Sequence, residues 1–133
     1  MTRQQVVPPS MAALVENVAY SPAVRVGDLL LVSGQVGRDR DLRPVVGDLE
    51  QHVRAAFDNL RLVVEHAGGS LADVVELTTY HVDIESQLPT FMAVKREYFG
   101  DRDTLPAWTA VGISALTTPD YVVEIQATAY LGD

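Results

Sequence analysis

The chain has 133 residues, of which 47% are hydrophobic and 21% are charged, so its composition is that of one folded domain over residues 1–133. Eighteen acidic residues outnumber ten basic ones, and the net charge of −8 argues against nucleic acid or an anionic membrane as a partner. The absence of cysteine excludes disulfides and thiol nucleophiles, and the absence of a signal-peptide pattern or a long apolar run predicts a cytoplasmic protein.

The N-terminal third is predicted to contain an irregular lead-in and a hairpin. Residues 1–15 hold Pro8-Pro9 among mixed polar residues, and we interpret them as irregular. Between residues 18 and 36, two short apolar runs flank the turn signal Gly27-Asp28, which indicates a β-hairpin. The second run is apolar on both faces, as expected for a strand that is covered on both sides.

The clearest predicted element is a helix that begins after Asp48, a plausible N-cap, and ends at Gly68-Gly69. Its apolar residues recur at spacings of three and four, which places them on one face. These residues are Leu49, Val53, Ala56, Phe57, Leu60, Val63, Val64 and Ala67. The two histidines of this helix, His52 and His66, are expected to be solvated.

Three further strands and a second helix are predicted in the rest of the chain. Residues 74–82 are rich in β-branched and aromatic residues and predict a strand. A weaker helical pattern follows Ser86, with Leu88, Phe91, Met92, Tyr98 and Phe99 on its apolar face. Residues 105–113 and 121–131 predict two more strands, and alternate residues of the last one are apolar.

The predicted order is ββαβαββ, an α/β (α+β) fold with a single sheet and two helices on one face. The other face of that sheet would then be uncovered. Leu30 and Val32 give it apolar content, so we expect the chain to associate with copies of itself.

Few residues stand out as candidates for chemistry. The histidines are not at metal-ligand spacing, and His81 is expected to be a satisfied, partly buried side chain. Ser33-Gly34-Gln35 ends a strand, where a glycine allows close approach, and its hydroxyl and backbone groups could equally line a pocket. Glu124 interrupts an apolar strand. If a second subunit covers it, burial would raise its pKa and make it a candidate general acid or base, whereas on an open face it would be a solvated carboxylate.

Several short motifs, taken together and in this order, resemble the Rid family (YjgF-like, formerly labelled L-PSP endoribonucleases). The resemblance covers residues 18–131, nearly the whole chain. The motifs are the run from Tyr20 to Asp28, Val32-Ser33-Gly34-Gln35, Asn59-Leu60 with Gly68-Gly69, Tyr98-Phe99-Gly100, Pro106-Ala107 and Val123-Glu124-Ile125.

The resemblance implies a chorismate-mutase-like fold and a homotrimer with small-molecule sites in the clefts between subunits. It also implies hydrolysis of reactive enamines and imines, such as 2-aminoacrylate and 2-iminopropionate, to a 2-keto acid and ammonia. Neither a metal nor an organic cofactor takes part in the family's reaction.

The family's pocket residues carry over in part. Tyr20, Ser33 with the adjoining Gly34, and Glu124 match the family's tyrosine, serine and water-activating glutamate. Trp108 stands where the family has an arginine that binds the substrate carboxylate. On the same alignment, Met92 replaces the pocket asparagine and Ala110 occupies the position of a small or sulfur-containing residue.

The exchange of arginine for Trp108 predicts a different substrate. An arginine–carboxylate pair is bidentate and charge-assisted, whereas an indole offers one N–H donor and a large apolar face. We therefore expect an imine or enamine other than 2-iminopropionate, with an aromatic or apolar group or without a carboxylate. Interface packing is the competing interpretation of Trp108. The sequence leaves open whether Arg25 or Arg38 replaces the missing cation.

Two other functions are compatible with the same residues. One is a trimer that binds a small molecule, or only its own subunits, without chemistry. The other is a ribonuclease, which the acidic charge and the lack of a basic, aromatic stripe disfavour.

Overall fold

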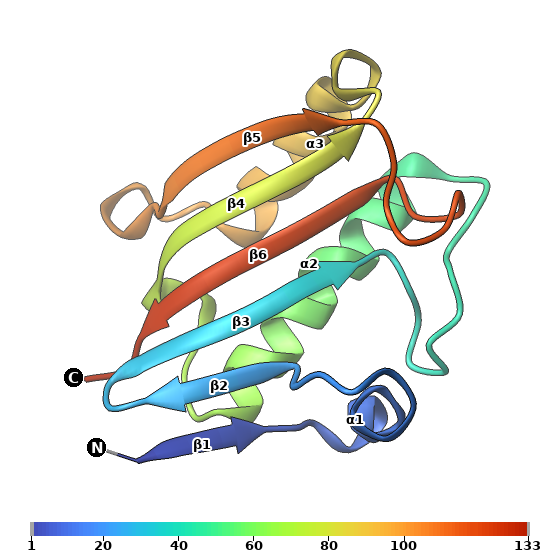
Figure 1. Ribbon diagram of the computed structural model, residues 1–133. Helices are drawn as coiled ribbons and strands as arrows, with labels where there is room; N and C mark the ends of the chain where they lie inside the picture. The colour runs from blue at the N-terminus through green and yellow to red at the C-terminus, as the bar shows by residue number, and fades with distance from the viewer. Residues whose placement is uncertain (1, 133) are drawn as a thin grey trace.

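The computed structural model describes residues 2–132 and shows one mixed sheet with helices packed behind it (Figure 1). The strand order is β1-β2-β3-β6-β4-β5, and every neighbouring pair is antiparallel except β4 with β5. The strands are β1 (Arg3–Val6), β2 (Ala23–Val26), β3 (Leu29–Val36), β4 (Val74–Val82), β5 (Ala107–Ile113) and β6 (Val123–Tyr130). The helices are α1 (Ala12–Val18), α2 (Leu49–His66) and α3 (Ile84–Tyr98), with short 3₁₀ turns at Pro9–Met11, Leu71–Asp73 and Arg102–Thr104.

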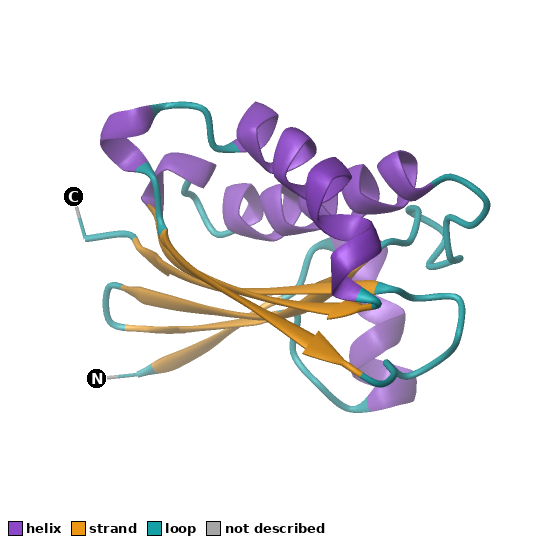
Figure 2. Cartoon of the chain, turned by 90° about the horizontal axis from the view of Figure 1, so that it is seen from above, coloured by secondary structure: helices purple, strands orange, loops and turns teal. Residues whose placement is uncertain are grey.

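Helices α2 and α3 lie side by side on one face of the sheet, as predicted (Figure 2). The core between these layers is built from the buried side of α2 and from alternate residues of the central strands β3, β4 and β6. Along β6 the inward residues Val123, Ile125, Ala127 and Ala129 are buried, and the residues between them are more exposed. This two-residue period confirms the face assignment made from the sequence.

Helix α2 forms where its apolar spacing predicts it. The carboxylate of Asp48 accepts a hydrogen bond from the backbone N–H of Gln51 at 3.1 Å, which caps the first turn. Gly68 adopts a φ of +96° just after the helix, a conformation that favours glycine. The core-facing residues of the helix that are fully buried are Val53, Ala56, Phe57, Leu60, Val63 and Val64.

The interpretation of residues 1–15 as irregular was wrong. Arg3–Val6 form an edge strand that pairs antiparallel with β2, and Ala12–Val18 form a short helix at one end of the sheet. The strand has no apolar alternation of its own, and only Val6 is buried, so its structure depends on pairing with a distant segment. The Pro8-Pro9 pair does not prevent helical structure, because proline is well tolerated in a first helical turn.

Helix α3 begins at Ile84, earlier than the pattern after Ser86 predicts, and its buried face also differs. Phe91 and Val94 face the core together with the polar Gln87, whereas Met92 is 44% exposed. Met92 is therefore a surface residue in the single chain, which corrects its placement on the apolar face.

The second face of the sheet is uncovered in the single chain (Figure 2). Leu30 and Val32, which the sequence predicted on this face, are buried in the core instead, because the alternation of β3 points them toward the helices. Leu29 and Leu31 of β3, Val111 of β5 and Tyr130 of β6 expose between 37% and 48% of their surface on the uncovered face. We call this surface the open face. Within residues 2–132, no helix combines the length and the apolar character needed to cross a membrane.

Candidate functional site

Glu124 lies on the open face, near the start of β6, and it is half-buried even in the single chain. Its register partners are Val36 on β3 and Tyr80 on β4. Burial raises the pKa of the Glu124 carboxyl above its ordinary value, and the nearby positive charge of Arg38 partly opposes that rise. A carboxyl in such surroundings can hold and release a proton closer to neutral pH than a solvated one.

Gly34 gives the Glu124 side chain its space. The β3–β6 register shifts between Val32 and Gln35, so Gly34 lies in an irregular segment of the strand. A Cβ atom at position 34 would lie within 2.4 Å of the Glu124 carboxyl carbon, which no side chain tolerates without moving. The sequence suggested close approach at this glycine, and the structure shows that the group approached is the candidate acid or base itself.

The hydroxyl hydrogen of Ser33 is already donated in a hydrogen bond within the chain. Its Oγ donates to the carbonyl oxygen of Ser21 at 2.6 Å. The remaining lone pairs of that oxygen are acceptors, so Ser33 can receive a hydrogen bond from a substrate N–H but cannot donate one in this arrangement.

Tyr20 and Arg38 complete this group of residues. The guanidinium Nη2 of Arg38 donates to the phenolic oxygen of Tyr20 at 3.1 Å. Because that oxygen accepts from Arg38, its own hydrogen is free to be donated to a ligand. Tyr20, Ser33, Gly34, Arg38 and Glu124 therefore form one polar cluster, which we call the acid cluster.

Trp108 and Met92 lie elsewhere. The Trp108 ring packs toward α3 on the helix-covered side of the sheet, stacked with Phe91 at 6.0 Å between ring centroids. A pocket of about 290 Å³ lies beside it, and Lys95 extends over the indole with Nζ at 4.5 Å from the ring centroid. Burial and then the neighbouring Arg96 lower the pKa of Lys95. We call this the indole pocket, and its lining residues are Met92, Lys95, Arg96, Phe99, Gly100, Arg102, Leu105 and Trp108.

A chain of buried hydrogen bonds fixes the orientation of Trp108. Its indole N–H donates to Thr79 Oγ1 at 2.9 Å, and the Thr79 hydroxyl bonds to His81 Nε2 at 2.8 Å. His81 Nδ1 contacts the side-chain oxygen of Gln87 at 3.0 Å. His81 is thus fully buried and fully bonded, and burial lowers its pKa so that it stays neutral. The expectation that His81 is satisfied by hydrogen bonds is confirmed, but it is fully rather than partly buried. Packing accounts for much of the conformation of Trp108.

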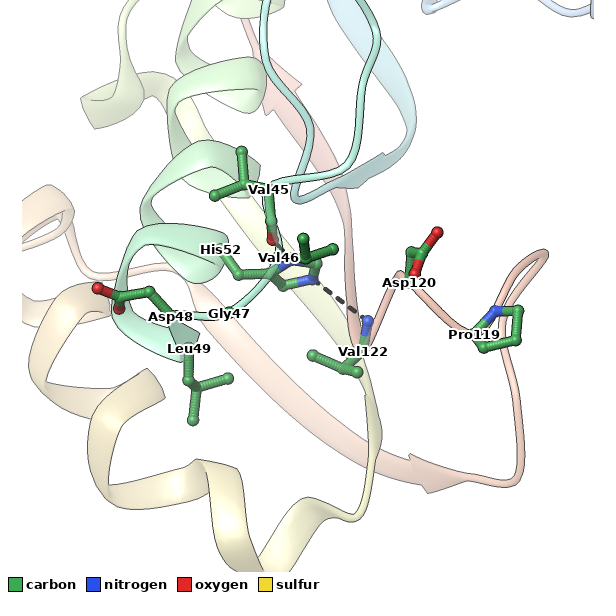
Figure 3. Close-up of a pocket in the computed structure, with 9 residues that line it drawn as sticks. All are labelled: Val45, Val46, Gly47, Asp48, Leu49, His52, Pro119, Asp120 and Val122. Carbon is green, nitrogen blue, oxygen red and sulfur yellow. Dashed lines mark hydrogen bonds between the residues drawn. The ribbon is translucent and has the colours of Figure 1, made fainter.

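His52 is buried rather than solvated, which corrects the prediction for this residue. It lines a pocket of about 330 Å³ between the loop before α2 and the segment before β6 (Figure 3). Its Nδ1 lies 2.7 Å from the carbonyl oxygen of Val45, and its Nε2 accepts from the backbone N–H of Val122 at 3.2 Å. Both ring nitrogens are therefore used to join two loops, and His52 fixes the chain two residues before Glu124.

The structure brings the candidate residues together as two groups rather than as one. The acid cluster faces the open side of the sheet, whereas Trp108, Ala110 and Met92 belong to the side covered by α3. Lys95 was not among the predicted site residues, and Arg38 was named only as an open alternative to Arg25. No spacing distinguishes either residue from the other basic residues. Within residues 2–132, no three His, Cys, Asp or Glu side chains are arranged to hold a metal ion.

Gly34→Ala is expected to lower the rate of any reaction that depends on the Glu124 carboxyl, while leaving the fold intact. The new methyl group would displace the flexible Glu124 carboxyl, and a displacement of about 1 Å at a reacting group costs about a hundredfold in rate. Unfolding should change by less than about 1 kcal/mol, because no backbone atom is in the way and the φ of residue 34 is not left-handed. Gly112→Ala, where the nearest contact is Ile84 at 3.1 Å, is the matched control. Equal activity of both variants would contradict the close approach inferred here.

Comparison with known proteins matches the chain to one family model and to several relatives of similar length. Residues 10–131 match the family model described as endoribonuclease L-PSP. The chain is 41% identical over 125 residues to the RutC family protein YjgH of Escherichia coli, and the match covers 94% of each protein. It is 33% identical over 98 residues to a 2-iminobutanoate/2-iminopropanoate deaminase of Dermatophagoides farinae, covering 73% of this chain and 74% of that one.

Solved structures agree with the sequence matches. A structure of protein YJGH superposes with a TM-score of 0.90 at 39% identity, covering all of this chain and 99% of the other. A YjgF/YER057c/UK114 family member from Mycobacterium tuberculosis has a TM-score of 0.81 at 32% identity, covering 97% of this chain and 99% of the other.

Proposed function

Because the chain belongs to the endoribonuclease L-PSP family, the YjgF-like Rid family that its sequence resembles, we propose that it hydrolyses reactive imines or enamines. The observation that carries this proposal is the acid cluster, where a half-buried carboxyl with a raised pKa lies against Gly34 and near the charge of Arg38, which donates to Tyr20. The name of the Dermatophagoides farinae relative, an imine deaminase, supports the same reaction class.

The proposed reaction converts a C=N bond and one water into a C=O bond and ammonia. Glu124 accepts a proton from water as the water oxygen bonds to the imine carbon, and it passes that proton to the imine nitrogen, which becomes an amine. The tetrahedral intermediate then gives its hydroxyl proton to Glu124 as the carbonyl forms and the C–N bond breaks, and Glu124 passes this second proton to the leaving nitrogen, which departs as ammonia. Ser33 accepts a hydrogen bond from the substrate N–H, and Tyr20 donates one to the substrate.

The indole pocket sets the size of the proposed substrate. Trp108 and Met92 present apolar surface at the positions where the family resemblance has an arginine and an asparagine. Lys95, Arg96 and Arg102 also line this pocket, but contact with apolar surface such as that of Trp108 and Met92 is worth about 1–3 kcal/mol for each added methylene. A substituent larger than the methyl of 2-iminopropionate therefore binds better there. We therefore expect imines with bulky apolar or aromatic substituents to be the better substrates.

A homotrimer is part of the proposal, because one chain does not bring the two groups of residues together. Packing the open face of one subunit against the indole-pocket edge of the next would unite them and would cover Leu29 and Leu31. Light scattering is expected to give a mass of three times 14.5 kDa. Replacing Leu31, which is 48% exposed, by aspartate should shift the mass toward that of a single chain. A wild-type mass of 14.5 kDa would contradict the shared site.

The competing candidate is a trimer that binds a ligand without chemistry. The observation in its favour is the fixed Trp108, which packs on Phe91 and donates to Thr79 where a substrate-binding arginine would otherwise be. A ribonuclease, which the printed name of the family model suggests, is disfavoured by the net charge of −8. A coupled keto-acid assay over imines formed from alanine, leucine and phenylalanine separates these functions. Turnover that grows with substituent size supports the proposal, and no turnover of any imine contradicts it.

A further inference from the structure

We propose that Arg38 binds the carboxylate of the substrate, which makes the substrate of this site a 2-imino acid. The inference rests on the proposed function for the reaction but not for the binding of the anion, which can be measured separately. In the family resemblance, the arginine that binds the substrate carboxylate stands at position 108. We assign that role in this chain to Arg38, in the loop after β3.

The backbone of Arg38 is held firmly in place. Its N–H donates to the carbonyl of Val36 at 2.9 Å, and its own carbonyl accepts from the side-chain amide of Asn59 at 2.9 Å. The same amide donates to the carbonyl of Val36 at 3.0 Å. Asn59 is buried in α2, so a core helix anchors the loop that carries this guanidinium.

The Arg38 side chain is only partly satisfied. Its Nη2 donates to Tyr20, but its Nε is buried and has no acceptor within residues 2–132. No carboxylate of that part of the chain forms an ion pair with it. Buried N–H groups are nearly always bonded, so the hydrogen bonding of this cation is incomplete in the single chain. With no carboxylate partner of its own, the guanidinium is available to an anionic ligand through the N–H groups that remain accessible.

Arg25 and Lys95 are less suitable than Arg38 for this role. The Nε of Arg25 already donates to the carbonyl of Gly27, and its Nη2 lies 3.9 Å from Asp28, at the turn of the hairpin. Lys95 lies over the Trp108 ring on the covered side of the sheet, away from Glu124 of the same chain.

The location of Arg38 fits the chemistry of one class of compound. In a 2-imino acid the carboxylate carbon is bonded directly to the imine carbon, so its cation must share a site with the acid or base. Arg38 lies close enough for its charge to act on Glu124, yet the two form no ion pair. A substrate can therefore place its carboxylate on the guanidinium and its C=N bond at Glu124, with the side chain directed to the indole pocket of a neighbouring subunit.

Calorimetric titration tests the binding directly, with phenylpyruvate and its uncharged methyl ester as probes. Arg38→Met is expected to weaken phenylpyruvate binding by about tenfold to a hundredfold and to leave binding of the ester unchanged. Arg38→Lys should retain part of the difference, because it keeps the charge but not the bidentate geometry. Arg40→Met is the matched control, since Arg40 is exposed two residues further along.

Four results would overturn the assignment. Two concern Arg38→Met: a wild-type affinity for phenylpyruvate, or an equal loss for the ester and the acid. The third is a loss that follows Lys95→Met instead, and the fourth is a wild-type protein that does not prefer the acid to the ester. If phenylpyruvate binding depends on Arg38 but no imine is turned over, the anion site stands and the proposed hydrolysis fails.

Discussion

Glu124→Gln is expected to lower kcat/KM for imine hydrolysis by about a hundredfold to ten-thousandfold, the usual contribution of a positioned acid or base. Glutamine keeps the size and hydrogen-bonding shape of the side chain but cannot exchange a proton. Steady-state kinetics on the best imine of the panel measures the effect. Glu65→Gln, an exposed carboxylate on α2, is the matched control and should leave the rate unchanged.

The pH profile separates the two roles open to this carboxyl. A base must be ionised, so the rate would rise with pH through the pKa of Glu124, which burial places above the ordinary 4.5. An acid must be protonated, so the rate would instead fall through the same pKa. The titratable and charged groups around Glu124 are Arg38 in the loop after β3, Tyr20 bonded to Arg38, and Tyr80 paired on β4.

Removal of Arg38 should shift the inflection of the pH–rate profile, which is the pH at which the rate changes as Glu124 titrates. The positive charge of Arg38 lowers the pKa of Glu124, so Arg38→Met is expected to shift the inflection to higher pH, while Glu124→Gln abolishes it. A wild-type profile that survives in Glu124→Gln, with an unchanged rate, would show that another group performs the proton transfer.

The sequence predicted the elements that carry a pattern or composition of their own. Helix α2 and strand β6 were found because each buries one face at a regular spacing over many residues, and β4 was found because it is rich in β-branched and aromatic residues. Strand β1 was missed, because four mostly exposed residues carry no such pattern and are ordered only by pairing with β2. Helix α1 was missed because two prolines precede it, although Met11 and Leu14 are buried in the core.

Only the site residues that belong to a sequence motif could be predicted from the sequence. The resemblance identified Tyr20, Ser33, Gly34 and Glu124, and the structure places all four in one cluster. The sequence could not choose between Arg25 and Arg38, because the fold of the loop that carries Arg38 and its anchor on Asn59 are set by contacts between residues 21 positions apart. His52 was misjudged for the same reason, since its burial depends on Val122, 70 positions away.

The position of Trp108 explains why the single substitution Trp108→Arg should not restore the carboxylate binding that the family resemblance assigns to an arginine at this position. An arginine at 108 would share the indole pocket with Lys95, Arg96 and Arg102, and no acidic residue lines that pocket. Like charges in a confined pocket repel one another, and the new guanidinium would be pushed away from the substrate. Trp108→Arg alone is therefore expected to lose turnover of large imines and to gain little on 2-iminopropionate.

The double variant Trp108→Arg with Lys95→Met is expected to reverse the substrate preference. Replacing the indole removes the apolar wall that a phenyl group needs, and removing the lysine lets the new arginine extend. For the small 2-iminopropionate the arginine offers the carboxylate a second cation besides Arg38, and a charge-assisted pair is worth about 1.5–3 kcal/mol. The ratio of kcat/KM for 2-iminopropionate to that for the phenylalanine-derived imine should rise by about a hundredfold over wild type. Lys95→Met alone keeps the indole wall, so its ratio should stay near that of wild type. If the double variant folds and trimerises with an unchanged ratio, Trp108 does not contact the substrate, and its interpretation as a packing residue is the correct one.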